Sequence, residues 1–184
     1  MSRYQTGRER FILGATPLFG GLNRVRPHHM FARTDLEAIE RNCLTQWQMV
    51  GSYSGLYFTS YPQHAFRVPD SEEYIRVTRA PRLAADNGIK FWCSAEWADD
   101  WSGRQSHFAP YLYGAKFEAI SEDAFNRIVQ ESSSDLVAPL LLPLHESKGF
   151  VGALLMYSME TDFIVSLVAE YEDEFIHYFW ETTA

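Results

Sequence analysis

Cysteines and long apolar runs are both scarce in this sequence. Among 184 residues there are only two cysteines, Cys43 and Cys93. Two thiols cannot build a disulfide scaffold, and their separation does not fit a metal site. The longest apolar run, 136–144, contains two prolines and is far too short to span a bilayer. Since no signal-peptide pattern is visible near the first residues either, we expect a cytoplasmic protein with no membrane partner.

Positive charge is also in short supply. The formal net charge is -8, and acidic side chains concentrate near the end of the sequence. A nucleic-acid surface needs clustered lysine and arginine to neutralise phosphates. We therefore expect no direct nucleic-acid partner and interpret the late acidic residues as a solvated face.

Motifs for catalysis are missing as well. None of the six histidines has the spacing of a metal-binding helix, and no phosphate-binding glycine loop, G-x-S-x-G or C-x-x-C occurs. Glu96, Asp99 and Asp100 could act as paired carboxylates. They alternate with Trp97 and Trp101, however, which favours a polar loop at the rim of a site. We expect binding rather than catalysis, without a cofactor or a metal.

The composition is that of a folded domain. Hydrophobic residues make up 46% of the sequence, charged residues 22% and aromatic residues 15%. This balance excludes a disordered chain, and the length allows one large core. Residues 1–30 contain scattered arginines and glycines without a sustained period, which predicts an N-terminal arm. Residues 31–184 then form the single domain.

Five local patterns predict structure before residue 136. Thr34 and Glu37 have capping-box spacing, which indicates a helix start. The aromatic stretch SGLYFTSY is typical of a strand, as is IKFWCS after a turn. Residues 71–83 fit either a helix or a strand. The expected elements in chain order are a helix over 35–49, a strand over 54–61, the undecided 71–83, a strand over 89–94 and a helix over 121–131 capped by Ser121.

The strongest pattern covers residues 136–180. Two apolar segments joined by the polar turn 145–149 predict a strand pair, and the rest predicts a closing amphipathic helix. The inward stripe of that helix would consist of Phe163, Val165, Leu167, Val168, Tyr171, Phe175, Tyr178 and Phe179. Together these elements predict an α+β fold, an α-β-α sandwich with a central antiparallel sheet.

Aromatic residues from different elements form the candidate binding site. Such side chains supply apolar walls for a small ligand, and the polar tips of tyrosine and tryptophan orient it. Phe91 and Trp92 are the strongest pair, because adjacent strand residues point to opposite faces. The candidate ligand-binding residues are Tyr57, Tyr61, Phe66, Tyr74, Phe91, Trp92, Trp97 and Trp101.

The stretch LVAPLLLPLHESKGFVGALLMYS, with the predicted helix after it, resembles the end of a GAF-like sensory domain. Within that group it is most similar to the autoinducer-binding domain of quorum-sensing transcription regulators. The resemblance covers roughly residues 35–180 and implies lactone binding. The sequence departs from the family where a Trp and an Asp-Pro normally follow the Tyr-Pro: Ala65 or Phe66 and Thr78–Arg79 stand there instead.

A second resemblance covers residues 29–100. HMFARTDLEAIERNCL followed by GLYFTSYPQHA is similar to the opening of ADP-ribosyltransferase-type enzymes. It implies an NAD cleft and a late catalytic glutamate, for which Glu96, Glu118 and Glu131 are all open candidates.

The first resemblance accounts for more of the sequence. We therefore expect a sensory or regulatory domain without a DNA-binding module of its own. It would bind a small apolar ligand or a protein partner and form a homodimer. An NAD-dependent transferase is the alternative.

Overall fold

The computed structural model describes residues 55–68, 72–82, 88–98, 105–140, 142, 149–157 and 163–183. The predicted N-terminal arm, the helix expected over 35–49 and Trp101 lie outside these residues.

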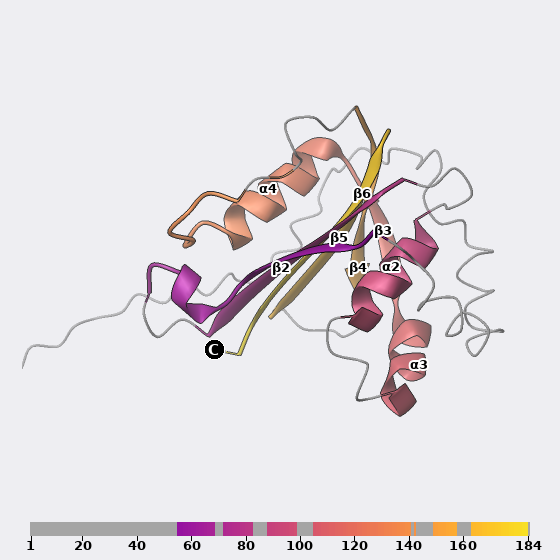
Figure 1. Cartoon of the computed structure of the whole chain (residues 1–184), viewed down its shortest axis with the longest axis horizontal. Helices are drawn as coiled ribbons and strands as arrows, with labels where there is room; N and C mark the ends of the chain where they lie inside the picture. The colour runs from indigo at the N-terminus through magenta and orange to yellow at the C-terminus, as the bar shows by residue number, and fades with distance from the viewer. Residues whose placement is uncertain are drawn as a thin grey trace, which may run out of the picture.

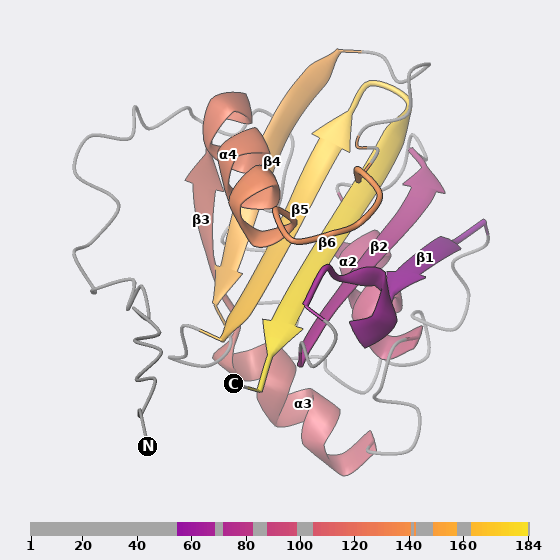
Figure 2. The same ribbon diagram turned by 90° about the vertical axis from the view of Figure 1, so that its left-hand side faces the viewer.

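The described residues are organised around one antiparallel sheet of six strands in the order β1-β2-β6-β5-β4-β3 (Figure 2). All neighbouring strands pair antiparallel. The predicted α+β class with an antiparallel sheet is therefore confirmed. The strands are β1 (Tyr57–Tyr61), β2 (Glu73–Pro81), β3 (Lys116–Ile120), β4 (Phe150–Tyr157), β5 (Ile164–Tyr171) and β6 (Glu174–Thr182).

Helices lie on both sides of this sheet (Figure 1). Helix α4 (Glu122–Ser132) lies on one side, and α2 (Ile89–Glu96) and α3 (Gln105–Gly114) lie on the other. A short 3-10 helix, η1 (Gln63–Ala65), follows β1.

Helix α4 forms where the sequence predicted a helix. The Ser121 hydroxyl accepts a hydrogen bond from the Ala124 amide at 3.2 Å, as expected of an N-cap residue. Its apolar stripe, including Phe125 and Val129, packs on strand residues such as Leu155 and Tyr178. This contact anchors α4 to its face of the sheet.

The opposite face carries an aromatic core. Phe91 stacks on Phe175 with ring centroids 5.4 Å apart, and Trp92 meets the Phe117 ring edge-on at 4.9 Å. Phe108 from α3 is also fully buried there. Aromatic pairs at such separations add to the stability gained from burial.

The predicted closing helix is wrong, since β5 and β6 occupy that part of the chain. The apolar residues do not form one helical stripe, because successive residues point to opposite faces of the sheet. Tyr178 lies on the α4 side, whereas Phe175 and Val168 lie on the α2 side. Strands that are buried on both faces have nearly continuous apolar sequences, which can be mistaken for a buried helix.

The strand predicted over 89–94 is also wrong, since these residues begin helix α2. Every residue of this helix from Phe91 to Glu96 is buried, so no polar face reveals its period. The strand expected at 136–144 is absent among its described residues, 136–140 and 142. The second strand of that pair is confirmed as β4, and residues 73–81, left undecided, form β2.

Candidate functional site

A buried polar cluster lies between the sheet and α2, with His177 at its centre. The His177 Nε2 atom is 2.9 Å from the Ser166 Oγ atom and 3.1 Å from the Glu96 Oε1 atom. His177 and Ser166 are completely buried and Glu96 is almost so. Arg76 and Thr78 are also buried, and Thr78 is the register neighbour of His177 on the next strand.

Strand alternation places this cluster. His177 is two residues from Phe175, and Ser166 is two residues from Val168, so they share a face with these core residues of the α2 side. Helix α2 packs on β6, and Glu96 is its last residue. The carboxylate therefore reaches His177 from the helix end.

The charges of the cluster stabilise one another. Burial disfavours the Glu96 carboxylate, but His177 attracts it and hydrogen-bonds to it. With attraction from Arg76 and a hydrogen bond from Tyr111, the pKa of Glu96 falls below its ordinary value. Burial in turn lowers the pKa of Arg76, although Glu96 opposes this shift. The Arg76 guanidinium carbon also lies 5.6 Å from the centre of the Phe179 ring, within cation–π range.

The geometry of the cluster differs from a nucleophile–histidine–acid triad. In such a triad the serine and the acid use different ring nitrogens of the histidine. Here Ser166 and Glu96 both approach Nε2, and the Nδ1 atom has no hydrogen-bond partner among the described residues. Neither Ser166 nor His177 is exposed to solvent. We interpret the cluster as a buried charge network that fixes α2 on the sheet.

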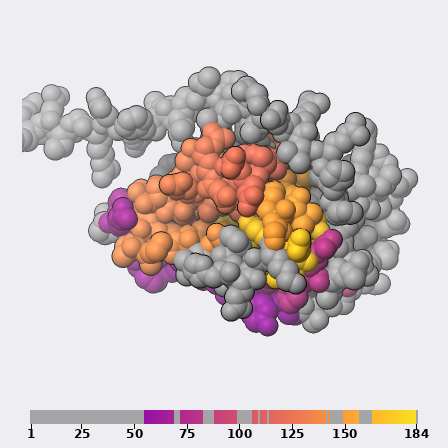
Figure 3. Space-filling view, turned by 90° about the horizontal axis from the view of Figure 1, so that it is seen from above, coloured from indigo at the N-terminus to yellow at the C-terminus, as the bar shows by residue number. Residues whose placement is uncertain are grey.

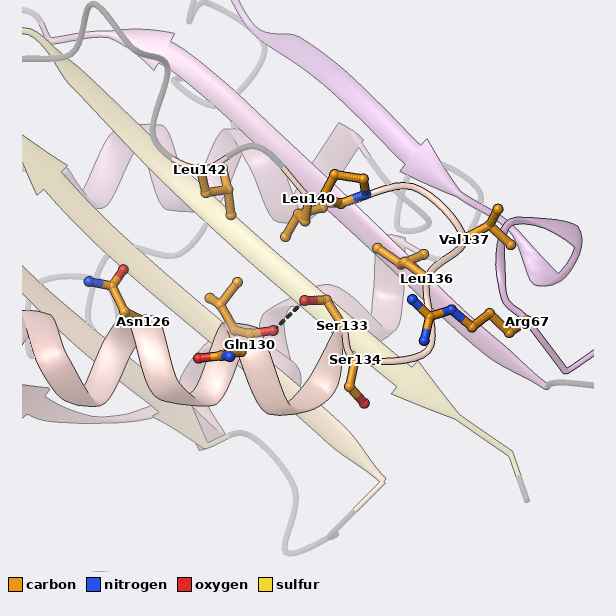
Figure 4. Close-up of a pocket in the computed structure, with 11 residues that line it drawn as sticks. Arg67, Asn126, Gln130, Ser133, Ser134, Leu136, Val137, Leu140 and Leu142 are labelled. Atoms are coloured by element: carbon orange, nitrogen blue, oxygen red, sulfur yellow. Dashed lines mark hydrogen bonds between the residues drawn. The ribbon is translucent and has the colours of Figure 1, made fainter.

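A groove on the opposite side of the sheet is open to solvent. It lies between α4 and the segment 133–142, with Arg67 at one end (Figure 4). Figure 3 shows α4 and this segment next to each other on the surface. The groove has a volume of about 390 Å³. Its lining residues are Arg67, Asn126, Val129, Gln130, Ser133, Ser134, Leu136, Val137, Pro139, Leu140 and Leu142.

Backbone hydrogen bonds hold the segment across from α4. The Arg67 amide donates to the Asp135 carbonyl at 2.7 Å, and the Val137 amide donates to the Ala65 carbonyl at 2.9 Å. Between them, Phe66 and Leu136 form an isolated β-bridge, and both side chains are buried. The wall of the groove is therefore fixed to the core, while its outer residue Val137 is 66% exposed.

The groove combines apolar walls with a few polar groups, the usual character of small-molecule sites. The Ser133 hydroxyl donates to the Val129 carbonyl at 2.6 Å (Figure 4). This bond satisfies a backbone carbonyl in the last turn of α4. Arg67 is exposed and has no ion-pair partner among the described residues. Its guanidinium can interact with an acceptor oxygen of a ligand.

The residues expected to line a binding site are spread over the structure. Phe91, Trp92 and Trp97 come together in the α2–α3 core, where Trp97 is half-buried and its ring lies 5.3 Å from that of Phe108. Phe66 is buried on the α4 side of the sheet.

Three further residues of that set, Tyr57, Tyr61 and Tyr74, lie on β1 and its neighbour β2. Tyr57 is 68% exposed on β1, and Tyr61 is half-buried at the other end of the same strand. The Tyr74 hydroxyl on β2 donates to the Ser60 hydroxyl at 3.2 Å. None of the predicted residues lines the groove beside α4.

Arg76, Ser166 and His177 were not among the residues predicted for a site. A signal existed for Ser166 and His177, since each is a single polar residue within a run of strand-forming residues, as in FIHYFW. Ser166 and His177 fell within the segment predicted as a helix. The strand interpretation would have placed both in the core.

Metal ligands and membrane spans give no further site. Among the described residues, no group of histidine, cysteine, aspartate or glutamate could hold a metal ion. In the same part of the chain, none of the helices has the length and apolar character needed to cross a membrane.

Comparison with known proteins gives no relative. No family model matches the chain, and no curated protein or solved structure matches it significantly.

Proposed function

We propose that this protein is a cytoplasmic sensory or regulatory domain that binds a small molecule in the groove beside α4. The observation that carries the proposal is the groove itself, about 390 Å³ in volume and within the range of small-ligand sites. The α-β-α sandwich expected for such a domain agrees with helices on both sides of the sheet (Figure 1).

The chemistry of the groove favours a ligand with an apolar body and one polar end. Leu136, Leu140 and Leu142 provide apolar surface, and Arg67 provides a cation at one end. An acyl chain with an amide, lactone or carboxylate head has this character. Autoinducers of quorum sensing belong to this chemical class.

Binding would act by selecting one arrangement of the groove walls. A ligand that contacts both α4 and the segment 133–142 stabilises the conformations in which the two lie at the bound distance. Val137 and Gln130 are exposed at the groove, so a bound ligand would change the surface there. A protein partner could then bind the free and the ligand-bound surfaces with different affinities.

The transferase alternative has less support. Glu96 is buried against His177, whereas Glu118 on β3 and Glu131 on α4 are exposed. The three glutamates are alternatives for one catalytic residue, and none of them lines the groove.

A thermal-shift series with acyl-homoserine lactones and with fatty acids of matched chain length tests the proposal. We expect the midpoint of unfolding to rise with ligand concentration, because a ligand that binds only the folded state stabilises it. The substitution Gln130→Trp fills the groove and should abolish the shift. Glu131→Trp, next to it on α4 but outside the groove, should keep it.

Two results would contradict this function. One is the absence of any shift, together with no bound compound in native mass spectra of the purified protein. The other is a shift that Gln130→Trp leaves intact. Hydrolysis of labelled NAD that is lost on Glu96→Gln, Glu118→Gln or Glu131→Gln, in a variant that circular dichroism shows to be folded, would instead favour the transferase.

A further inference from the structure

Strand β1 is an edge of the six-stranded sheet and is unusually exposed (Figure 2). Four of its five residues are exposed, and the fifth, Tyr61, is half-buried. Tyr57 is 68% exposed and Phe58 is 47% exposed. These two aromatic side chains point to opposite faces, so both faces of β1 carry an exposed aromatic residue.

The other sheet edge has the usual protection. Strand β3 has the sequence KFEAI, with exposed Lys116 and Glu118. Charged side chains on an edge strand oppose pairing with another chain. Strand β1 has the sequence YFTSY and carries no charge and no proline. Only β1 of these two edges lacks such protection.

We propose that β1 pairs antiparallel with β1 of a second copy of this chain, so that two sheets become continuous through their uncharged edges. The pairing has two-fold symmetry, in which the same surface of both copies meets. All five residues of both strands overlap only when Thr59 lies on the two-fold axis.

This register is self-complementary. Thr59 lies opposite Thr59 of the second copy, and threonine pairs are favourable across antiparallel strands. Tyr57 lies opposite Tyr61 of the second copy, which covers the most exposed aromatic residue of the strand. Phe58 lies opposite Ser60 of the second copy.

The β1 edge suits pairing with a second copy better than the β3 edge does. The same full overlap for β3 would place Glu118 opposite Glu118, and like charges directly opposite destabilise a strand pair. For β1 no such repulsion arises, although each copy has a net charge of -8. The uncharged edge is therefore the place where two acidic copies can approach.

A charge-swap experiment on Thr59 tests the pairing. Thr59→Lys and Thr59→Glu each place like charges opposite one another, so each variant should be monomeric where the wild type dimerises. An equimolar mixture places Lys opposite Glu and should restore a heterodimer. Sedimentation equilibrium over a concentration series measures all four samples, and circular dichroism verifies that the variants fold.

Glu118→Lys on the opposite edge is the matched control and should leave the dimer unchanged. A wild type that stays monomeric throughout the series would overturn the proposal. So would a dimer that survives either Thr59 variant, or two folded monomeric variants that fail to associate when mixed.

Discussion

The Glu96 carboxylate lies 3.1 Å from the His177 ring, with both side chains buried between α2 and the sheet. Removing charges from water is costly, and a buried pair recovers that cost only with good geometry and further hydrogen bonds. Ser166 and Tyr111 supply such bonds, and Arg76 supplies a cation that attracts the carboxylate. The pair thus links a helix to three strands, which makes it a point where stability can be probed.

Removing the Glu96 charge should destabilise the fold. Glu96→Gln keeps the shape of the side chain but leaves Arg76 buried without its carboxylate. Breaking a buried pair of this kind costs about 3 kcal/mol of unfolding free energy. Urea denaturation measures this loss, and Glu118→Gln at an exposed position should change stability by less than about 0.5 kcal/mol.

A double-mutant cycle checks whether the loss comes from the pair. If Glu96 and His177 interact as the structure shows, the double variant Glu96→Gln with His177→Gln should cost less than the sum of the single variants. Additive losses would contradict direct coupling.

The Glu96 carboxylate should make the stability of the fold depend on pH in the acidic range. The pKa of Glu96 is lowered in the folded protein from its ordinary value of 4.5. A group with a depressed folded pKa contributes stability above its unfolded pKa, and this contribution is lost as the pH falls through the folded pKa. Stability should therefore decline below about pH 4.5. Urea unfolding at a series of acidic pH values should show a smaller decline for Glu96→Gln, and parallel curves would exclude this role.

The sequence predicted elements with a clear local signal and missed elements buried on both faces. Strand β1 and helix α4 were predictable because each has a clear local signal, an aromatic strand run and a serine cap. Strands β5 and β6 were not, because both their faces are buried and the period of two disappears. Helix α2 failed for the same reason, since Trp92 and Cys93 are buried as fully as Phe91.

The candidate sites depend on contacts that no local pattern contains. The groove exists because Phe66 bridges to Leu136, 70 positions later. The charged cluster brings together Arg76, Glu96 and His177 from distant parts of the chain. Residue types indicated aromatic and polar groups, but only the strand order shows which of them meet.

Two buried tyrosines should respond oppositely to loss of their hydroxyl. The Tyr178 hydroxyl lies 2.7 Å from Ser132 Oγ, which itself donates to the Ile128 carbonyl, so Tyr178 is the donor. Tyr178→Phe should cost about 1 kcal/mol. The buried Tyr171 hydroxyl has no partner among the described residues. Tyr171→Phe should thus be neutral or stabilising in thermal unfolding, and a loss as large as that of Tyr178→Phe would reveal a missing partner.

Alkaline pH gives a second measurement on Tyr171. Burial, reinforced by nearby Glu122 and Glu174, raises the pKa of Tyr171 to about 12 from its ordinary value of 10.0. A group whose pKa is raised in the folded state makes its full contribution to stability below its unfolded pKa. That contribution is lost as the pH rises toward the folded pKa. Stability should decline between about pH 10 and pH 12. Tyr171→Phe should lose less stability over this window, and an unchanged decline would assign the effect to other groups.

The backbone before α2 provides the last prediction. Gly88 has a φ of 92°, a left-handed backbone conformation that residues other than glycine and asparagine rarely adopt. Its carbonyl accepts the first hydrogen bond of the helix, from the Trp92 amide at 2.9 Å. Gly88→Ala should therefore destabilise the fold by about 1 kcal/mol, while Gly88→Asn should cost less because asparagine tolerates this region. Equal losses in urea denaturation for the two variants would show that side-chain size, and not backbone conformation, limits this position.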